Sequence, residues 1–150
     1  MIRAIFSCER GNSFVEMALT APILAALLLG MVDISRGVST KLQLVQAAQR
    51  TVELAQRSGF QYADIADLEA EAETAAGTGS NATVTGWLEC GSSTTRLSWT
   101  STCSSGQAYS RHIDVTITRP FTPLFGVRFF PGANSDGTFT VSALAGVRVQ

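Results

Sequence analysis

The chain has 150 residues, and its 11 basic and 12 acidic side chains give a formal net charge of -1 at pH 7. This balance lacks the basic surplus typical of nucleic-acid-binding domains, so we expect no nucleic acid among its partners. The chain has one histidine, no Cys-x-x-Cys pair, no phosphate loop and no dinucleotide fingerprint, so we expect no metal and no cofactor.

The most informative segment is the apolar run from Phe14 to Val32. Its about 19 residues span roughly 28 Å as a helix, close to the bilayer core of about 30 Å. Two arginines precede the run, whereas one aspartate and one arginine follow it and cancel. The positive-inside rule therefore places the N-terminus in the cytoplasm and the residues after 36 outside. The alternative is a cleaved secretory signal, which normally has a shorter apolar core and a small-x-small cleavage site.

Glu16 is the only charge within this run, and a carboxylate inside an apolar helix usually has a partner or a task. The residues around it read Arg10-Gly11-Asn12-Ser13-Phe14-Val15-Glu16-Met17-Ala18-Leu19, and Pro22, Gly30, Asp33 and Arg36 follow. This pattern resembles the class III signal of type IV pilins and, within that class, the TadE-like pseudopilins of the tight-adherence (Tad/Flp) pilus system. The resemblance is close over residues 10–57. Major pilins of this system usually carry tyrosine after the glutamate, so Met17 favours a minor pilin.

The resemblance implies that a prepilin peptidase cuts after Gly11 on the cytoplasmic side, which makes residues 1–11 a cytoplasmic leader. The new amino terminus at Asn12 would pair with Glu16 of a neighbouring subunit and set the register of assembly. Such a pair offsets part of the cost of burying each charge. The alternative is an interfacial Glu16 that stays solvated among lipid headgroups. The implied partners are the bacterial inner membrane, other pilins or pseudopilins, and tight-adherence assembly proteins.

Beyond the membrane, apolar residues continue at helical spacing. They form one stripe with charged and amide side chains between them: Val38, Leu42, Val45, Ala48, Val52 and Ala55. Ser58-Gly59 is a helix stop. We therefore predict one long helix over residues 12–58, with a transmembrane half at 14–32 and an outer half that supports a head. A membrane anchor joined to a core-facing helix is the simpler alternative.

Residues 59–81 are predicted to form a short acidic helix, from Tyr62 to Ala76, and a linker. One side of this helix is apolar, and its acidic side is interpreted as solvated surface. Residues 82–150 are predicted to form a β-rich head outside the membrane, in the periplasm if the resemblance holds. Alternating patterns predict strands at residues 82–89, 111–119 and 138–145. The expected fold class is α+β, with a small antiparallel sheet packed on the long helix.

Cys90 and Cys103 flank a polar stretch that is predicted to be a loop or short hairpin, whereas Cys8 lies in the leader. In an oxidising compartment this pair favours a disulfide, worth about 3 kcal/mol for a loop of this size. Two free thiols are the alternative.

Two further segments contain side chains that could form a catalytic site or a contact surface. His112 and Asp114 share one strand face, but no serine or cysteine nucleophile elbow accompanies them, so we expect no enzyme activity. Residues 120–131 hold four phenylalanines among three prolines. This segment is interpreted as a lid on the small core or, alternatively, as an apolar contact surface in which Phe129 and Phe130 take part.

The sequence therefore predicts a minor pilin or pseudopilin that acts in pilus assembly or surface adhesion. The main alternative is an unprocessed, single-pass, membrane-anchored protein with a periplasmic binding or structural head.

Overall fold

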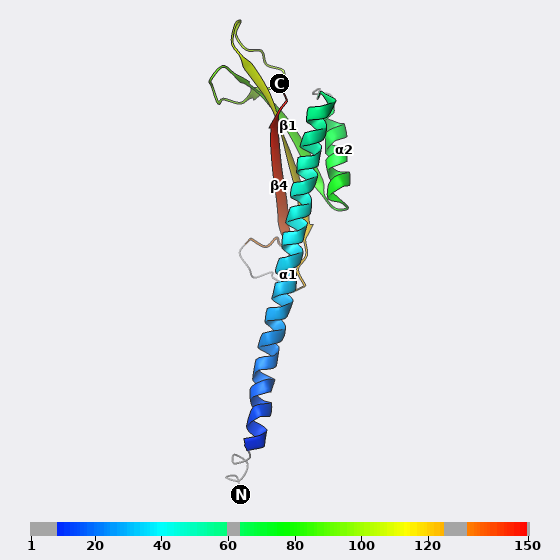
Figure 1. Cartoon of the computed structure of the whole chain (residues 1–150), viewed down its shortest axis with the longest axis vertical. Coiled ribbons are helices and arrows are strands. Elements are labelled where there is room, and N and C mark those ends of the chain that lie inside the picture. The colour runs from blue at the N-terminus through cyan, green and yellow to red at the C-terminus, as the bar shows by residue number, and fades with distance from the viewer. Residues whose placement is uncertain (1–8, 60–63, 125–131, 150) are drawn as a thin grey trace.

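A computed structural model describes residues 9–59, 64–124 and 132–149, with side chains from residue 13 onward. A long helix carries a small α+β head near its C-terminal end (Figure 1). In chain order the elements are α1 (Glu9–Ser58), α2 (Ile65–Ala76), β1 (Asn81–Cys90), β2 (Leu97–Ser98), β3 (Tyr109–Phe121) and β4 (Phe139–Arg148). This architecture confirms the predicted fold class. The predicted start of the second helix at Tyr62, and residues 125–131, lie outside the described residues.

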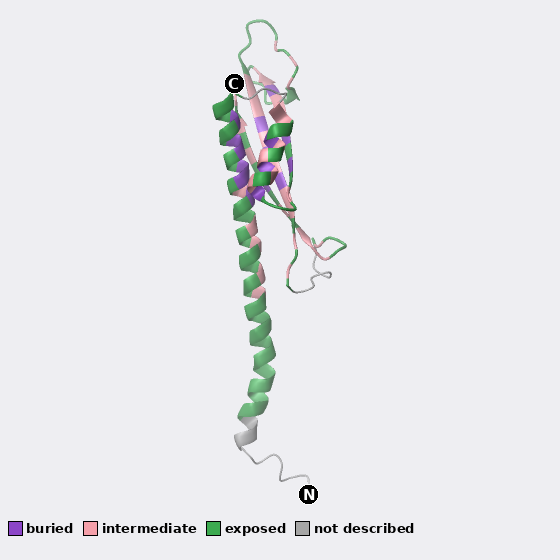
Figure 2. Ribbon diagram, turned by 90° about the vertical axis from the view of Figure 1, so that its right-hand side faces the viewer, coloured by how far each residue is buried: buried purple, intermediate pink, exposed green. Residues whose placement is uncertain are grey.

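The helix α1 has 50 residues and runs through Pro22 without interruption. Proline removes one backbone donor, which membrane helices tolerate. Every described residue from Ser13 to Leu29 is exposed, and the first buried residue is Leu44 (Figure 2). The head therefore packs only against the C-terminal part of α1.

The predicted apolar stripe on this helix is only partly correct. Ala48 and Ala55 are fully buried, but Val38 and Leu42 are 53% and 55% exposed. The buried face also contains residues that the prediction did not include, namely Leu44, Ala47 and Thr51. The buried Thr51 hydroxyl has a hydrogen-bond partner, because it donates to the Ala47 carbonyl at 3.0 Å. The head therefore begins to bury α1 only at Leu44 and leaves the first part of the predicted stripe exposed.

The sheet has the strand order β2-β1-β3-β4, and all its pairs are antiparallel. Alternate residues of β3, namely Ile113, Val115 and Ile117, are completely buried, as their pattern predicted. They form one core with apolar side chains of both helices: Leu44, Ala48, Val52, Leu68, Ala72 and Ala76. The strand β2 provides the short hairpin within the stretch that was predicted to be a loop or hairpin.

Pro120 lies within β3, at a position where its missing donor is harmless. Gly91 N–H donates to the Ala108 carbonyl at 2.7 Å, so even-numbered residues of β3 form the hydrogen bonds to β1. The β1–β3 register ends at Asn81, which pairs with Thr118, so Pro120 lies beyond that ladder. The strand can thus continue to Phe121 and pair with β4.

The acidic face of α2 is not simply solvated surface. Glu73 accepts a hydrogen bond from the Ala82 N–H at 3.1 Å, and Glu69 accepts one from the Val84 N–H at 2.8 Å. These two backbone groups belong to the outer edge of β1, which pairs with β2 only near its C-terminal end. On the same helix, Glu71 pairs with Arg50 of α1 at 3.4 Å. The carboxylates therefore attach α2 to the sheet and to α1, which corrects the interpretation from sequence.

Candidate functional site

The predicted cleavage position lies at the start of α1. This helix begins at Glu9, so the Gly11–Asn12 peptide bond belongs to its first turn. A peptidase that binds its substrate in an extended form would have to unwind only this terminal turn, which has few intrahelical hydrogen bonds to lose. Cleavage after Gly11 stays a prediction.

Glu16 lies one turn further along, in a fully exposed apolar surface. Its neighbours Phe14 and Met17 are 79% and 71% exposed. The Thr20 hydroxyl donates to the Glu16 backbone carbonyl at 3.0 Å, so Thr20 engages the main chain and leaves the carboxylate to other partners. Within the described residues this is the one helix long and apolar enough to cross a membrane. The segment from Phe14 to Val32 is a possible membrane anchor.

The apolar surface of α1 continues past the end of this anchor. Ile34 is 70% exposed, and Val38 and Leu42 are each more than half exposed. These three residues follow each other at intervals of four, so they lie along one side of the helix. At this level of the molecule, the head does not cover that side. It is an apolar surface outside the length that a bilayer core would bury.

Asp33, just after the apolar segment of α1, connects this helix to the chain that follows β3. Both of its carboxylate oxygens lie 2.9 Å from the backbone N–H of Leu124, which follows β3. Arg36 lies 3.2 Å from the same carboxylate, whose side chain is only 13% exposed. This arrangement links two points that are 91 positions apart in the chain. We call the group Asp33, Arg36, Phe121 and Leu124 the helix-exit anchor.

Phe121 completes the helix-exit anchor. The Arg36 guanidinium lies over its ring at 5.5 Å from the centroid. On the same side of α1, a Cβ at Gly37 would lie 3.8 Å from the Phe121 ring. This is ordinary van der Waals distance, so the ring packs directly against this part of α1. The described part of the phenylalanine-rich segment therefore folds back onto α1, whereas Phe129 and Phe130 lie outside the described residues.

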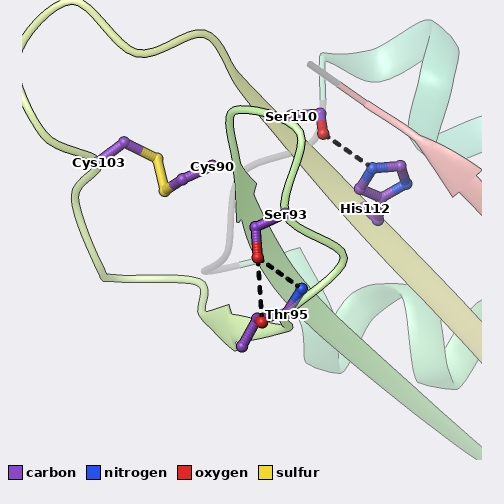
Figure 3. The surroundings of a disulfide bond; sticks show 6 residues. All are labelled: Cys90, Ser93, Thr95, Cys103, Ser110 and His112. Carbon is purple, nitrogen blue, oxygen red and sulfur yellow. Dashed lines mark hydrogen bonds between the residues drawn. A yellow bond between two sulfur atoms is a disulfide. The ribbon is translucent and has the colours of Figure 1, made fainter.

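The disulfide predicted from the spacing of the cysteines is present (Figure 3). Cys90 at the end of β1 is bonded to Cys103, with their Cα atoms 5.6 Å apart. The bond closes the loop that carries β2 at the end of the head far from the N-terminus. This loop is also attached through Arg96, which lies 4.0 Å above the Trp87 ring and 3.5 Å from Asp114.

His112 lies beside this loop, on the outer face of β3. Its Nε2 atom is 3.1 Å from the Ser110 hydroxyl (Figure 3). The same atom is 3.6 Å from a Glu89 carboxylate oxygen, and the ring stacks on Trp87. In a Ser-His-acid triad the acid holds one ring nitrogen and the serine the other. Here both groups face the same nitrogen, so the carboxylate cannot orient the ring for proton transfer from the serine. The contacts instead fix His112 between neighbouring strands.

Sequence reasoning missed the functions of Asp33, Glu69 and Glu73. The two glutamates are spaced i and i+4, which places them on one helix face, and that spacing was an available signal. Nothing local identified a partner for them, because the β1 edge is formed only when the sheet assembles. The contact between Asp33 and Leu124 had no signal in the local pattern at all. No group of three or more potential metal ligands occurs in the described part of the chain.

Comparison with known proteins gives one match, and it covers the helix. No curated protein and no solved structure matches the chain. The family model described as TadE-like protein matches residues 11–53, from the predicted cleavage position to the packed part of α1. The match confirms, for the N-terminal helix, the resemblance to TadE-like pilins of the tight-adherence system that its motif predicted.

Proposed function

We propose that the chain is a minor pilin or pseudopilin of a bacterial tight-adherence pilus and that it acts by assembly. A prepilin peptidase cuts it after Gly11, and the mature chain starts at Asn12. Its N-terminus begins in the cytoplasm, α1 crosses the inner membrane, and the head lies in the periplasm. Its partners are other pilins or pseudopilins and the assembly proteins of the system, and its role is in pilus assembly or surface adhesion rather than in catalysis.

The observation that carries this proposal is the length of the exposed apolar surface on α1. From Phe14 to Leu42 this surface extends over about 43 Å at about 1.5 Å per residue, against a bilayer core of about 30 Å. A lipid anchor needs no apolar side chains on the aqueous part. A helix that packs against other helices does need them, because its contacts continue beyond the membrane.

Glu16 supports the same proposal. An exposed carboxylate within an apolar helix is costly in a lipid environment, by about 2 to 3 kcal/mol near the bilayer centre and by less near the interface. In an assembly, the ammonium of Asn12 from a neighbouring subunit offsets this cost. The charge pair would then fix the relative position of neighbouring α1 helices, because a subunit shifted by one helical turn leaves both charges unpaired.

The competing proposal is an uncleaved, single-pass anchor with a binding or structural head in the periplasm. It explains residues 14–32 equally well, but it gives no role to the exposed Ile34, Val38 and Leu42. It predicts that neither a prepilin peptidase nor Glu16 matters.

The first experiment is the intact mass of the chain purified from membranes, with and without a co-expressed prepilin peptidase of the tight-adherence type. We expect a product that starts at Asn12 only when the peptidase is present. A full-length chain under both conditions would support the uncleaved anchor, and a start beyond Val32 would indicate a secretory signal.

The second experiment separates cleavage from assembly. In cells that make the pilus, Glu16→Ala should be cleaved normally but fail to enter the sheared pilus fraction or its membrane-bound base. Gln56→Ala is the control, because Gln56 is also an exposed polar residue of α1 but lies outside the membrane segment. Equal incorporation of the two variants would contradict the role of Glu16.

A further inference from the structure

The two edge regions of the sheet, along β1 and along β4, differ in what covers their backbone groups. The β1 edge is covered by α2, whose Glu69 and Glu73 accept its N–H groups. The β4 edge lies on the opposite side of α1 from α2 (Figure 1). An open edge is a template for another strand, and proteins normally block such an edge.

The register shows which groups of β4 face outward. Val149 N–H donates to the Arg111 carbonyl at 2.8 Å, in line with the β3–β4 register. Odd-numbered residues here therefore bond to β3, and the N–H and C=O groups of even-numbered residues point to the open side. Ser142 is one of these even-numbered residues, and its carbonyl accepts a hydrogen bond from Lys41 of α1. Among the described residues, Leu144 and Gly146 have no comparable cap.

A hollow of about 510 Å³ lies next to these uncapped groups, between β4 and α1. Its walls are Leu144, Ala145 and Gly146 on the strand, and Gln49, Val52 and Glu53 on the helix. Leu144 is 65% exposed on the outer face of the sheet. Polar backbone, apolar side chains and the Glu53 carboxylate thus lie together. The neighbour of Glu53 on its own helix is Arg57, at 3.8 Å, and both side chains are largely exposed, so a cation from a partner can replace this weak pair. The site suits an extended segment that inserts one long side chain with a cationic end.

A second copy of the chain does not fit this edge symmetrically. Lys41 contacts β4 at Ser142, and Val52 faces it nearer Leu144 and Gly146, so α1 and β4 run in the same direction. Antiparallel pairing of two β4 edges would therefore point the two α1 helices in opposite directions, which one membrane does not permit. The β1 edge of a second copy is also closed, by Glu69 and Glu73.

We propose that the β4 edge binds an extended segment of a different protein by strand addition. The segment alternates apolar and polar residues, and it places a lysine or arginine in the hollow toward Glu53. Backbone hydrogen bonds to Leu144 and Gly146 provide the affinity, and the hollow provides the selectivity. The exclusion of a second copy rests on the membrane anchoring proposed above, but the strand site itself does not.

The test uses the full chain in detergent micelles and labelled synthetic peptides of about nine residues that alternate threonine and valine. One peptide has a central lysine and the other a central glutamate. We expect saturable binding in fluorescence anisotropy, with the lysine peptide at least about tenfold tighter because Glu53 repels the other. Failure of both peptides to bind would overturn the proposal.

Two variants separate backbone from side chain. Leu144→Pro removes an outward N–H that β3 does not use, and it should weaken binding by at least about tenfold while the head stays folded. Leu144→Ser keeps that N–H and changes only the side chain, so it should weaken binding clearly less than Leu144→Pro does. Equal binding by both variants would contradict strand addition.

Hydrogen exchange on the unmodified chain tests the same point if the proline variant does not fold. The lysine peptide should slow exchange at Leu144 and Gly146 and leave Ala143 and Ala145, which already bond to β3, unchanged. Exchange that does not slow at Leu144 would overturn the proposal. Disulfide-linked dimers of Leu144→Cys in membranes would instead assign the edge to a second copy. Neither result depends on cleavage after Gly11, so failure here leaves the proposed function standing.

Discussion

The two halves of α1 differ both in composition and in what covers them. From residue 13 to 29 every side chain is exposed, whereas Leu44, Ala48 and Ala55 are completely buried by the sheet and α2. The exposed half is almost wholly apolar, whereas charged and amide side chains interrupt the apolar residues of the packed half. The difference shows that one helix serves two environments, and that the head supplies only one of them.

Polar contacts at two levels of α1 hold the head against the packed half of this helix. Next to the exposed half, Asp33 accepts a hydrogen bond from the backbone N–H of Leu124. Further up, Arg119 donates to Gln43 on α1 and to the Ala76 carbonyl at the end of α2, each at 3.0 Å. The packed half is therefore part of the head, and the exposed half is a projecting rod.

The largest expected effect is on the core. Leu44→Ala should lower the free energy of unfolding of the head by about 2 to 5 kcal/mol, because it removes a fully buried side chain. The measurement is urea unfolding in micelles, followed by the fluorescence of Trp87 and Trp99. Leu28→Ala is the matched control in the exposed half and should change the value by less than about 0.5 kcal/mol. Similar losses in both variants would mean that the two halves do not differ as described.

The disulfide should have the next largest effect. Replacing Cys90 and Cys103 together by serine should cost about 3 kcal/mol, because the unfolded chain gains the freedom of the opened loop. Thermal unfolding under non-reducing conditions measures this loss. The Cys8→Ser variant removes the third cysteine and is the control, which we expect to unfold at the unchanged temperature. A double variant as stable as the parent would show that the other loop contacts, such as Arg96 with Asp114, suffice.

A smaller effect is expected at the closed sheet edge. Glu69→Ala should cost about 1.5 kcal/mol, because the Val84 N–H loses a charge-assisted hydrogen bond. Asp67→Ala, on the exposed face of α2, should cost much less. Urea unfolding gives the two values. Equal costs would restore the interpretation that the acidic face is only solvated surface.

The smallest effect on stability is expected at the junction of the two halves. Asp33→Ala removes the acceptor of the Leu124 N–H and should cost about 1 kcal/mol. Asp33→Asn keeps one acceptor oxygen and should recover part of that loss. The measurement is amide exchange at Leu124, which should speed up in Asp33→Ala before any change in the core. Unchanged exchange would remove Asp33 from the helix-exit anchor.

The sequence predicted the elements well because their signals are local. Helical spacing identified α1, and alternation identified β1, β3 and β4. The disulfide was predicted from two cysteines 13 positions apart in a head expected to lie in an oxidising compartment. The boundaries were shorter than observed: β3 was predicted to begin at Arg111 but begins at Tyr109. Strand ends are defined by pairing with neighbours, and a single strand does not contain that information.

The sequence by itself determined the order of elements, the apolar helical segment with its single Glu16, and the α+β class, since each depends on residues close in the chain. Only the tertiary structure decided which sides of α1 are covered, which sheet edge is closed by Glu69 and Glu73, and that Asp33 meets Leu124. These contacts join residues that are distant in the chain, so they exist only after the sheet has closed on the helices. The physical reason is that burial and hydrogen-bond satisfaction are properties of the assembled surfaces and not of any one segment.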